Sequence, residues 1–182
     1  MRLFARLFSG LTLIVLIFGI WAALIPQRPV PPHPFPSDAV ALNGPVDRIL
    51  IEKSARRMTA YRNGTALKTY RIALGFAPDG NKFREGDGKT PEGIFRIDRL
   101  NDESAYHLSL GIDYPRPKDR ARAAASGVNP GGDIFIHGQP NQIPAGITLP
   151  GDWTAGCIAV SNSEIVEIFA AASIGTEVEI RP

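Results

Sequence analysis

The chain contains 182 residues, of which 44% are hydrophobic and 21% are charged, a composition that excludes a disordered tail and fits a globular protein. It carries 20 basic and 18 acidic residues, a near balance that argues against binding nucleic acid through phosphate neutralisation. The single cysteine, Cys157, excludes an intrachain disulfide and a zinc site built from several cysteines. The function therefore depends on whether Cys157 is a packing residue or a reactive thiol.

The N-terminal segment, residues 1–25, has the pattern of a membrane anchor. Arg2 and Arg6 precede a charge-free stretch, and residues 7–25 are nearly all apolar. As a helix this stretch would span about 28 Å, close to the roughly 30 Å hydrocarbon thickness of a bilayer. Because no clear small-x-small cleavage site follows, we expect an uncleaved inner-membrane anchor with the rest of the chain exported to the periplasm or outside. The alternative is a cleaved signal peptide and a secreted protein.

A proline-rich linker follows, with six prolines among residues 26–36. Such a density favours an extended conformation that acts as a semi-rigid spacer. Short strand patterns begin near Val46. We therefore divide the chain into an anchor or signal segment at 1–25, a linker at 26–45 and a folded domain at 46–182.

The folded domain is predicted to be mainly β with one or two short helices. Asn63-Gly64 marks a hairpin turn, and the pair Ser161 and Glu164 fits a capping box at the start of a helix. A second short helix is expected at 119–125. Strands are predicted at 48–52, 57–62, 67–74, 94–97, 107–110, 133–137, 158–160 and 176–180.

Two residues in this domain suggest chemistry. His137 ends an apolar strand, and Cys157 follows it by twenty residues, directly after Gly156. A free thiol is mostly protonated at neutral pH, so it needs a nearby base to act as a nucleophile, and a histidine also returns the proton to a leaving amine. Adjacent strands would bring the two side chains together. From the residues alone, packing and catalysis remain equally open for the cysteine.

The segments Ile136-His137-Gly138 and Gly156-Cys157-Ile158 resemble the signature of the L,D-transpeptidase (YkuD-type) catalytic domain. The segments Thr90-Pro91-Glu92-Gly93-Ile94-Phe95 and Tyr114-Pro115 resemble family segments as well. The stretch 152–162 is similar to the murein L,D-transpeptidase or YafK-like branch. The resemblance covers 46–182 and implies a β-sandwich-like mixed domain.

The resemblance implies a cysteine acyltransferase that acts on peptidoglycan. Family members form a thioester with the L-centre of a stem tetrapeptide, release D-alanine, and pass the acyl group to an amine on another stem or on an envelope protein. By motif, Cys157 is the nucleophile and His137 is the general base and acid. The carbonyl group of Gly138 orients the imidazole. The amides of Gly156 and Cys157, with Ala155 as a further donor, form the oxyanion hole.

Three residues near these motifs are further candidates for substrate contact. They are Trp153, Thr154 and Asp133, the last through a substrate ammonium group. Trp153 has a place in the core as its structural alternative, and Asp133 has a role in a turn or at a strand end. No cofactor is predicted. No metal is predicted either, because no third ligand stands at a recognisable spacing from His137 and Cys157.

The chain departs from the family pattern at two positions. Ala155 and Ala159 stand where a histidine and an arginine are usual. Transfer to an amine and transfer to water, as in an L,D-carboxypeptidase or an amidase that releases envelope protein, therefore both remain open. An inactive wall-binding module is a third alternative, and retention of both His137 and Cys157 speaks against it.

Overall fold

The computed structural model describes residues 42–182. The expected anchor at 1–25 and most of the expected linker at 26–45 lie outside the described residues, so the membrane anchor and the three-part division stay predictions. Within residues 42–182, no helix is both long enough and apolar enough to cross a bilayer.

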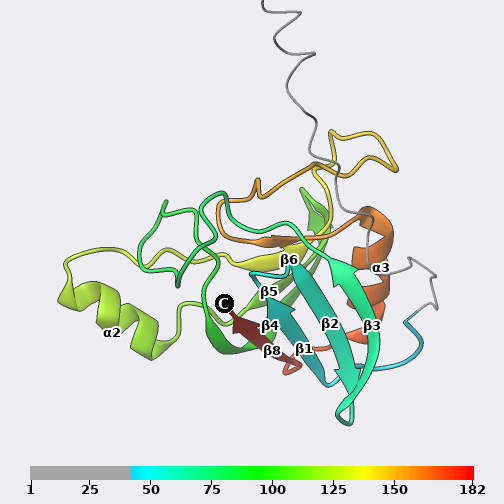
Figure 1. Ribbon diagram of the computed structural model, residues 1–182, viewed down its shortest axis with the longest axis horizontal. Coiled ribbons are helices and arrows are strands. Elements are labelled where there is room, and N and C mark those ends of the chain that lie inside the picture. The colour runs from blue at the N-terminus through cyan, green and yellow to red at the C-terminus, as the bar shows by residue number, and fades with distance from the viewer. Residues whose placement is uncertain (1–41) are drawn as a thin grey trace, which may run out of the picture. The chain divides into compact units, whose positions relative to one another are not determined.

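The described chain forms one mixed sheet with the strand order β3-β2-β1-β8-β4-β5-β6-β7 (Figure 1). The pairs β1–β8 and β6–β7 are parallel, and the other neighbours are antiparallel. The expectation of a mainly β domain with one or two short helices is confirmed. The strands are β1 (Arg48–Glu52), β2 (Arg57–Arg62), β3 (Thr65–Arg71), β4 (Gly93–Ser104), β5 (His107–Ile112), β6 (Phe135–His137), β7 (Ile158–Ala159) and β8 (Glu177–Arg181).

The sequence patterns locate most elements but misjudge the length of β4. Asn63 and Gly64 have φ values of 49° and 76° and join β2 to β3, as the hairpin signal predicts. Strand β4 extends to Ser104, whereas the apolar alternation predicts an end at Ile97. From Asp98 to Glu103 its side chains are exposed, so no burial pattern marks this half; backbone pairing with β5 forms it.

The two edges of the sheet meet. Ala73, which follows β3, exchanges two backbone hydrogen bonds of 2.9 Å with Ala159 of β7. The enclosed core is mostly aliphatic and includes Ile49, Ile136 and Ile158, all at most 1% exposed. As a result, β6 and β7, which carry or adjoin the candidate catalytic residues, are held between β5 and the chain that follows β3.

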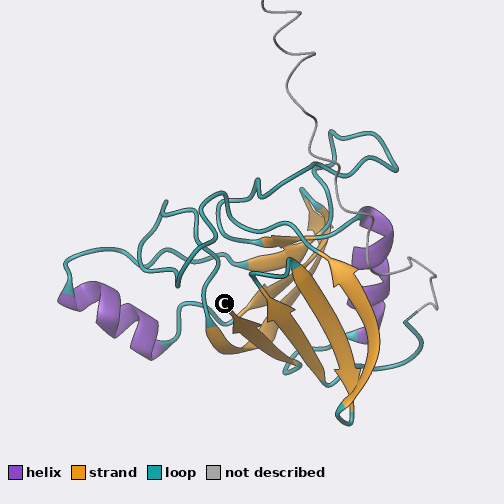
Figure 2. Ribbon diagram, viewed as in Figure 1, coloured by secondary structure: helices purple, strands orange, loops and turns teal. Residues whose placement is uncertain are grey.

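Two helices belong to the described chain, α2 (Pro117–Ala125) and α3 (Asn162–Ala171). Helix α3 begins at the predicted capping box and packs its apolar face against β5, whereas α2 projects at the far left of the view (Figure 2). In α2 the buried Asp119 pairs with Arg116 at 2.8 Å and with Arg122 at 3.7 Å. Arg116 and Arg122 therefore stabilise the helix by pairing with this buried carboxylate.

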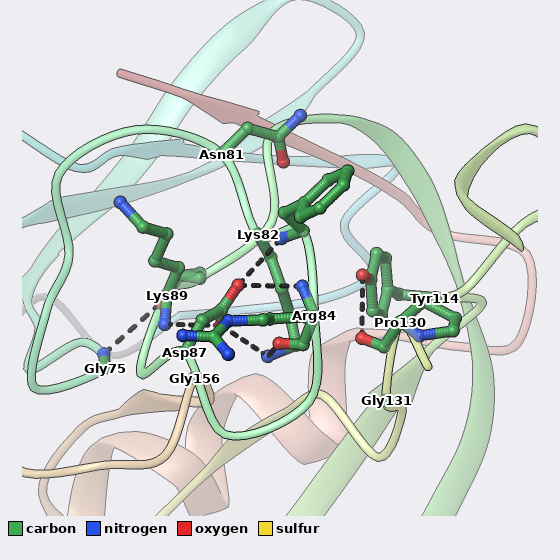
Figure 3. A network of polar contacts seen from close by, with 12 residues as sticks. Gly75, Asn81, Lys82, Arg84, Asp87, Lys89, Tyr114, Pro130, Gly131 and Gly156 are labelled. Atoms are coloured by element: carbon green, nitrogen blue, oxygen red, sulfur yellow. Dashed lines mark hydrogen bonds and ion pairs between the residues drawn. The ribbon is translucent and has the colours of Figure 1, made fainter. Parts of the chain in front are cut away.

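The loop between β3 and β4 is organised around a buried ion pair (Figure 3). Nζ of Lys82 lies 2.8 Å from Oδ1 of Asp87, and the two side chains are 3% and 7% exposed. Burial alone would raise the pKa of Asp87, but hydrogen bonds from the Arg84, Phe83 and Lys89 amides and from Lys82 outweigh it and lower that pKa to about 2.

We predict that Asp87→Asn lowers the free energy of unfolding by about 3 kcal/mol at neutral pH, because it leaves the Lys82 ammonium buried without a counter-charge. The folded pKa of Asp87, about 2, lies below its ordinary value of 3.8. The contribution of the Asp87 carboxylate to the free energy of unfolding is therefore complete above pH 3.8 and is lost as the pH falls through 2. Urea unfolding at several pH values measures both effects. The exposed Asp79→Asn is the control, and equal stability of the two variants would contradict the prediction.

Candidate functional site

The cysteine turn, residues 152–157, lies directly on the backbone of the β3–β4 loop. Gly156 has a φ of 140°, and a Cβ there would lie 2.7 Å from the carbonyl oxygen of Lys89. A Cβ on Gly75 would lie 2.1 Å from the oxygen of Gly88 and 3.0 Å from Cα of Gly156. Because no side chain fits at either position, two segments distant in sequence can pack backbone against backbone directly before Cys157.

Asp152 fixes the start of the cysteine turn. One carboxylate oxygen accepts a 2.9 Å hydrogen bond from the backbone N–H of Leu74, and the other accepts one of 2.9 Å from Nε of Arg56. The backbone N–H of Thr154 then donates to the Leu74 carbonyl at 3.1 Å. The turn is thereby tied to the chain that follows β3.

The hydroxyl group of Thr154 closes the turn from inside. It donates to the carbonyl oxygen of Cys157 at 2.8 Å and accepts from the N–H of Gly156 at 3.1 Å. Both hydrogen-bonding functions of this predicted substrate contact are therefore used within the turn. Among the described residues, the amides of Ala155 and Cys157 have no hydrogen-bond acceptor, unlike the Gly156 amide.

The sheet register places His137 and Cys157 on one face. His137 pairs with Ala159 and Ile136 pairs with Ile158, so Cys157, one residue earlier, lies beside Phe135. Alternate residues of a strand share a face, so the cysteine and the histidine lie diagonally across neighbouring strands. No hydrogen bond joins them in the described structure. Such bonds are often long or absent before substrate binds.

Hydrogen bonding fixes the tautomer of His137. Its Nδ1 lies 2.7 Å from the carbonyl oxygen of Gly138, and a carbonyl only accepts, so Nδ1 carries the hydrogen and Nε2 presents a lone pair. Gly138 is itself held by a 3.0 Å hydrogen bond from its N–H to the Tyr106 carbonyl. Burial lowers the pKa of His137 below its ordinary 6.5, which favours the neutral base.

The thiol of Cys157 is also held in its neutral form. Its Sγ donates to the backbone carbonyl of Asp133 at 3.4 Å. Burial raises the pKa of the thiol above 9.0; a hydrogen bond from the Phe135 backbone and the Lys82 charge act in the opposite direction without overcoming it. The carboxylate of Asp133 is 83% exposed and lies 3.3 Å from Arg99.

An aromatic cluster covers His137. The ring of Tyr106 lies 4.5 Å and that of Trp153 5.7 Å from the imidazole, measured between centroids. Tyr106 is missed by sequence reasoning because it lies in the β4–β5 turn, far from both motifs and without a local pattern. Nε1 of Trp153 is a buried donor with no hydrogen-bond partner in residues 42–182.

The two departures from the family pattern lie in different surroundings. Ala155 is exposed, so the histidine that is usual at this position in the family would lie on the surface of the turn. Ala159 is 2% exposed and pairs with Ala73, so an arginine would need space that this packing does not leave.

Tyr106→Ala is expected to raise the pKa of His137 toward 6.5, because burial is the main cause of its lowered value and the variant uncovers the ring. The lost cation–π attraction, about 0.5–1 kcal/mol, would oppose this rise only in part. Tyr106→Phe keeps the ring and should leave the pKa unchanged. NMR titration of the histidine ring protons measures the effect. Tyr61→Ala, which removes a ring stacked on Arg48, is the matched control. An unchanged pKa in Tyr106→Ala would contradict the covering role.

Comparison with known proteins is consistent with this geometry. YafK of Escherichia coli strain K12, whose name places it among the L,D-transpeptidases, is 32% identical over 105 residues, which cover 57% of this chain and 36% of YafK. The crystal structure of Pgp2, the helical cell shape determining protein of Campylobacter jejuni, matches with a TM-score of 0.57 and 27% identity. That match covers 76% of this chain and 48% of Pgp2.

The fold recurs in a more distant protein. Bd1075 of Bdellovibrio bacteriovorus matches with a TM-score of 0.54 at 23% identity, over 76% of this chain and 48% of that one. The chain thus spans about half or less of each of these relatives. The sequence model of the YkuD family, described as the L,D-transpeptidase catalytic domain, matches residues 46–180. This chain therefore belongs to the YkuD family of L,D-transpeptidase catalytic domains.

Proposed function

We propose that this chain is an exported L,D-transpeptidase in which Cys157 attacks a peptidoglycan stem tetrapeptide and His137 moves the proton. The observation that carries the proposal is the hydrogen bond from Nδ1 of His137 to Gly138, which leaves the Nε2 lone pair available on the face of the sheet that bears the thiol. Family membership supports the substrate class.

In the first half-reaction, Nε2 of His137 accepts the thiol proton as Sγ of Cys157 bonds to the carbonyl carbon at the L-centre of diaminopimelate. The bond from that carbon to the nitrogen of D-alanine then breaks. His137 returns its proton to the departing amine, and a thioester remains. The carbonyl group of Gly138 keeps Nδ1–H in place throughout and stabilises the imidazolium.

The developing oxyanion needs amide donors. The Cys157 amide, joined by that of Ala155, supplies them, because both lack an acceptor among the described residues. The Gly156 amide, also predicted from sequence, would first have to leave Thr154. The exposed carboxylate of Asp133 is a partner for a substrate ammonium. The unpartnered Nε1 of Trp153 is buried, so this side chain would first have to shift to donate to a substrate carbonyl.

In the second half-reaction an amine attacks the thioester, an amide bond forms, and the thiol recovers its proton. The acceptor amine belongs to another stem or to an envelope protein. The proposed site of action is the cell envelope, with the domain in the periplasm or outside and held by the segment 1–25. The likeness to Pgp2, a cell shape determining protein, supports a role in cell shape.

The proposal is tested by incubating the purified 182-residue chain with disaccharide tetrapeptide and weighing the products. A cross-linked dimer is expected. Tripeptide alone would identify a hydrolase, and absence of any product would overturn the enzyme proposal.

Cys157→Ala and His137→Gln should each reduce turnover by about a thousandfold, as loss of a nucleophile or base does in related chemistry. His107→Asn, on a histidine outside the site with a φ of 69° that asparagine tolerates, is the matched control. Turnover by Cys157→Ala at the wild-type rate would remove Cys157 from the site.

The pH dependence of kcat/KM should show an acidic limb below pH 6.5, because burial lowers the pKa of His137 and the neutral base persists as the pH falls. Thiolate should not accumulate until above pH 9, since burial raises the pKa of Cys157. Rates on the tetrapeptide from pH 4 to 10 and the rate of thiol alkylation measure these limits. An acidic limb above pH 6.5 would contradict the assignment of His137 as the base.

A further inference from the structure

A pocket of about 470 Å³ shares Asp133 with the candidate site, and the rest of its lining is used by no step of the mechanism above. Asp133 connects the two, since its backbone carbonyl accepts the Cys157 thiol while its side chain lines the pocket. Asp133 has a φ of 53°, so the chain turns sharply just before β6. The charged residues of the wall are Asp98, Arg99, Asp113, Arg116, Arg120 and Asp133.

The sheet register aligns the pocket with the nucleophile. Arg99 of β4 pairs with Gly111 of β5, and Gly111 pairs with Phe135 of β6, which lies beside Cys157. A Cβ on Gly111 would lie 2.7 Å from Nε of Arg99, so the missing side chain is what lets the arginine lie across the sheet. The guanidinium carbon of Arg99 lies 4.8 Å from the Phe135 ring centroid.

Three of the charged side chains already have structural partners. Arg116 pairs with the buried Asp119, Arg120 donates to the carbonyl of Pro115, and Asp113 accepts from a backbone amide of β4. The side chains of Arg99, Asp98 and Asp133 remain, and within residues 42–182 their charged groups pair with one another and with the Phe135 ring.

The contacts that remain are exposed. The side chains of Arg99 and Asp133 are 45% and 83% exposed, and exposed pairs of this kind contribute little to stability. A guanidinium and two carboxylates that are held by exposed ion pairs can exchange those partners for a ligand that carries both charges.

We infer that this pocket binds the zwitterionic D-centre of meso-diaminopimelate, with Arg99 on its carboxylate and Asp133 on its ammonium. The inference rests on the proposed function, because it names how the same site selects its acyl donor. In that residue five carbon–carbon bonds of about 1.5 Å separate the attacked carbonyl carbon from the D-centre, a reach of roughly 6 Å. A carbonyl at the Cys157 thiol therefore leaves the D-centre within reach of Asp133, whose backbone carbonyl lies 3.4 Å from Sγ. Lysine lacks the second carboxylate, so its ammonium group would contact Asp133 and nothing would bind Arg99.

Binding is measured by calorimetry in the Cys157→Ala chain, so that no turnover is required. The probes are two free tetrapeptides that differ only in meso-diaminopimelate or L-lysine at the third position. Arg99→Gln should weaken binding of the diaminopimelate peptide by about tenfold and leave the lysine peptide unchanged. Asp133→Asn, which tolerates the positive φ, should weaken both peptides, because both carry the ammonium group.

Arg96→Gln is the matched control, because this arginine lies on the same strand but donates to the carbonyl of Gly175 outside the pocket. Equal loss for both peptides in Arg99→Gln, or no preference in the parent chain, would overturn the inference. If Arg99→Gln selectively weakens binding of the diaminopimelate peptide but the wild-type chain forms no product, the pocket is upheld and the proposed reaction is rejected. If the wild-type chain forms product but Arg99→Gln still prefers the diaminopimelate peptide, the reaction is upheld and the pocket is rejected.

Discussion

The position of the nucleophile depends on peptide backbone packed against peptide backbone. The turn before Cys157 touches the β3–β4 loop where Gly75 and Gly156 leave no side chains between the two segments. The β3–β4 loop is held by a buried ion pair and by buried hydrogen bonds. Lys82 is buried with Asp87, and Lys53 is buried with hydrogen bonds to Glu92 and to two backbone carbonyls.

Lys82 lies in the β3–β4 loop, whereas Lys53 directly follows β1 and reaches into the loop. The cost of burying both charges is offset by their pairing with groups of the loop, which present a defined surface to the cysteine turn. The cysteine turn then needs only Asp152 and the hydroxyl of Thr154 to complete it. The residues that hold the site in place are thus not the residues that take part in the proposed reaction.

The same burial that positions the site sets its protonation states. His137 and Cys157 are both shifted toward their neutral forms, so the resting pair is a thiol and an imidazole rather than an ion pair. Charges then develop only during the attack on the substrate, when the amide dipoles stabilise the oxyanion and the Gly138 carbonyl stabilises the imidazolium. The β4–β5 hairpin supports both ends of this face, with Tyr106 against the base and Arg99 over the pocket.

Local patterns of burial and turn chemistry were enough to predict the mainly β fold, the Asn63-Gly64 hairpin and the capped helix. The motifs also singled out His137 and Cys157. Contacts in the folded chain were needed to find the tautomer of His137, the occupied Gly156 amide and the parts played by Tyr106 and Arg99. Each of these depends on contacts between segments far apart in the chain, and Tyr106 and Arg99 lie in an exposed hairpin that no periodicity reveals.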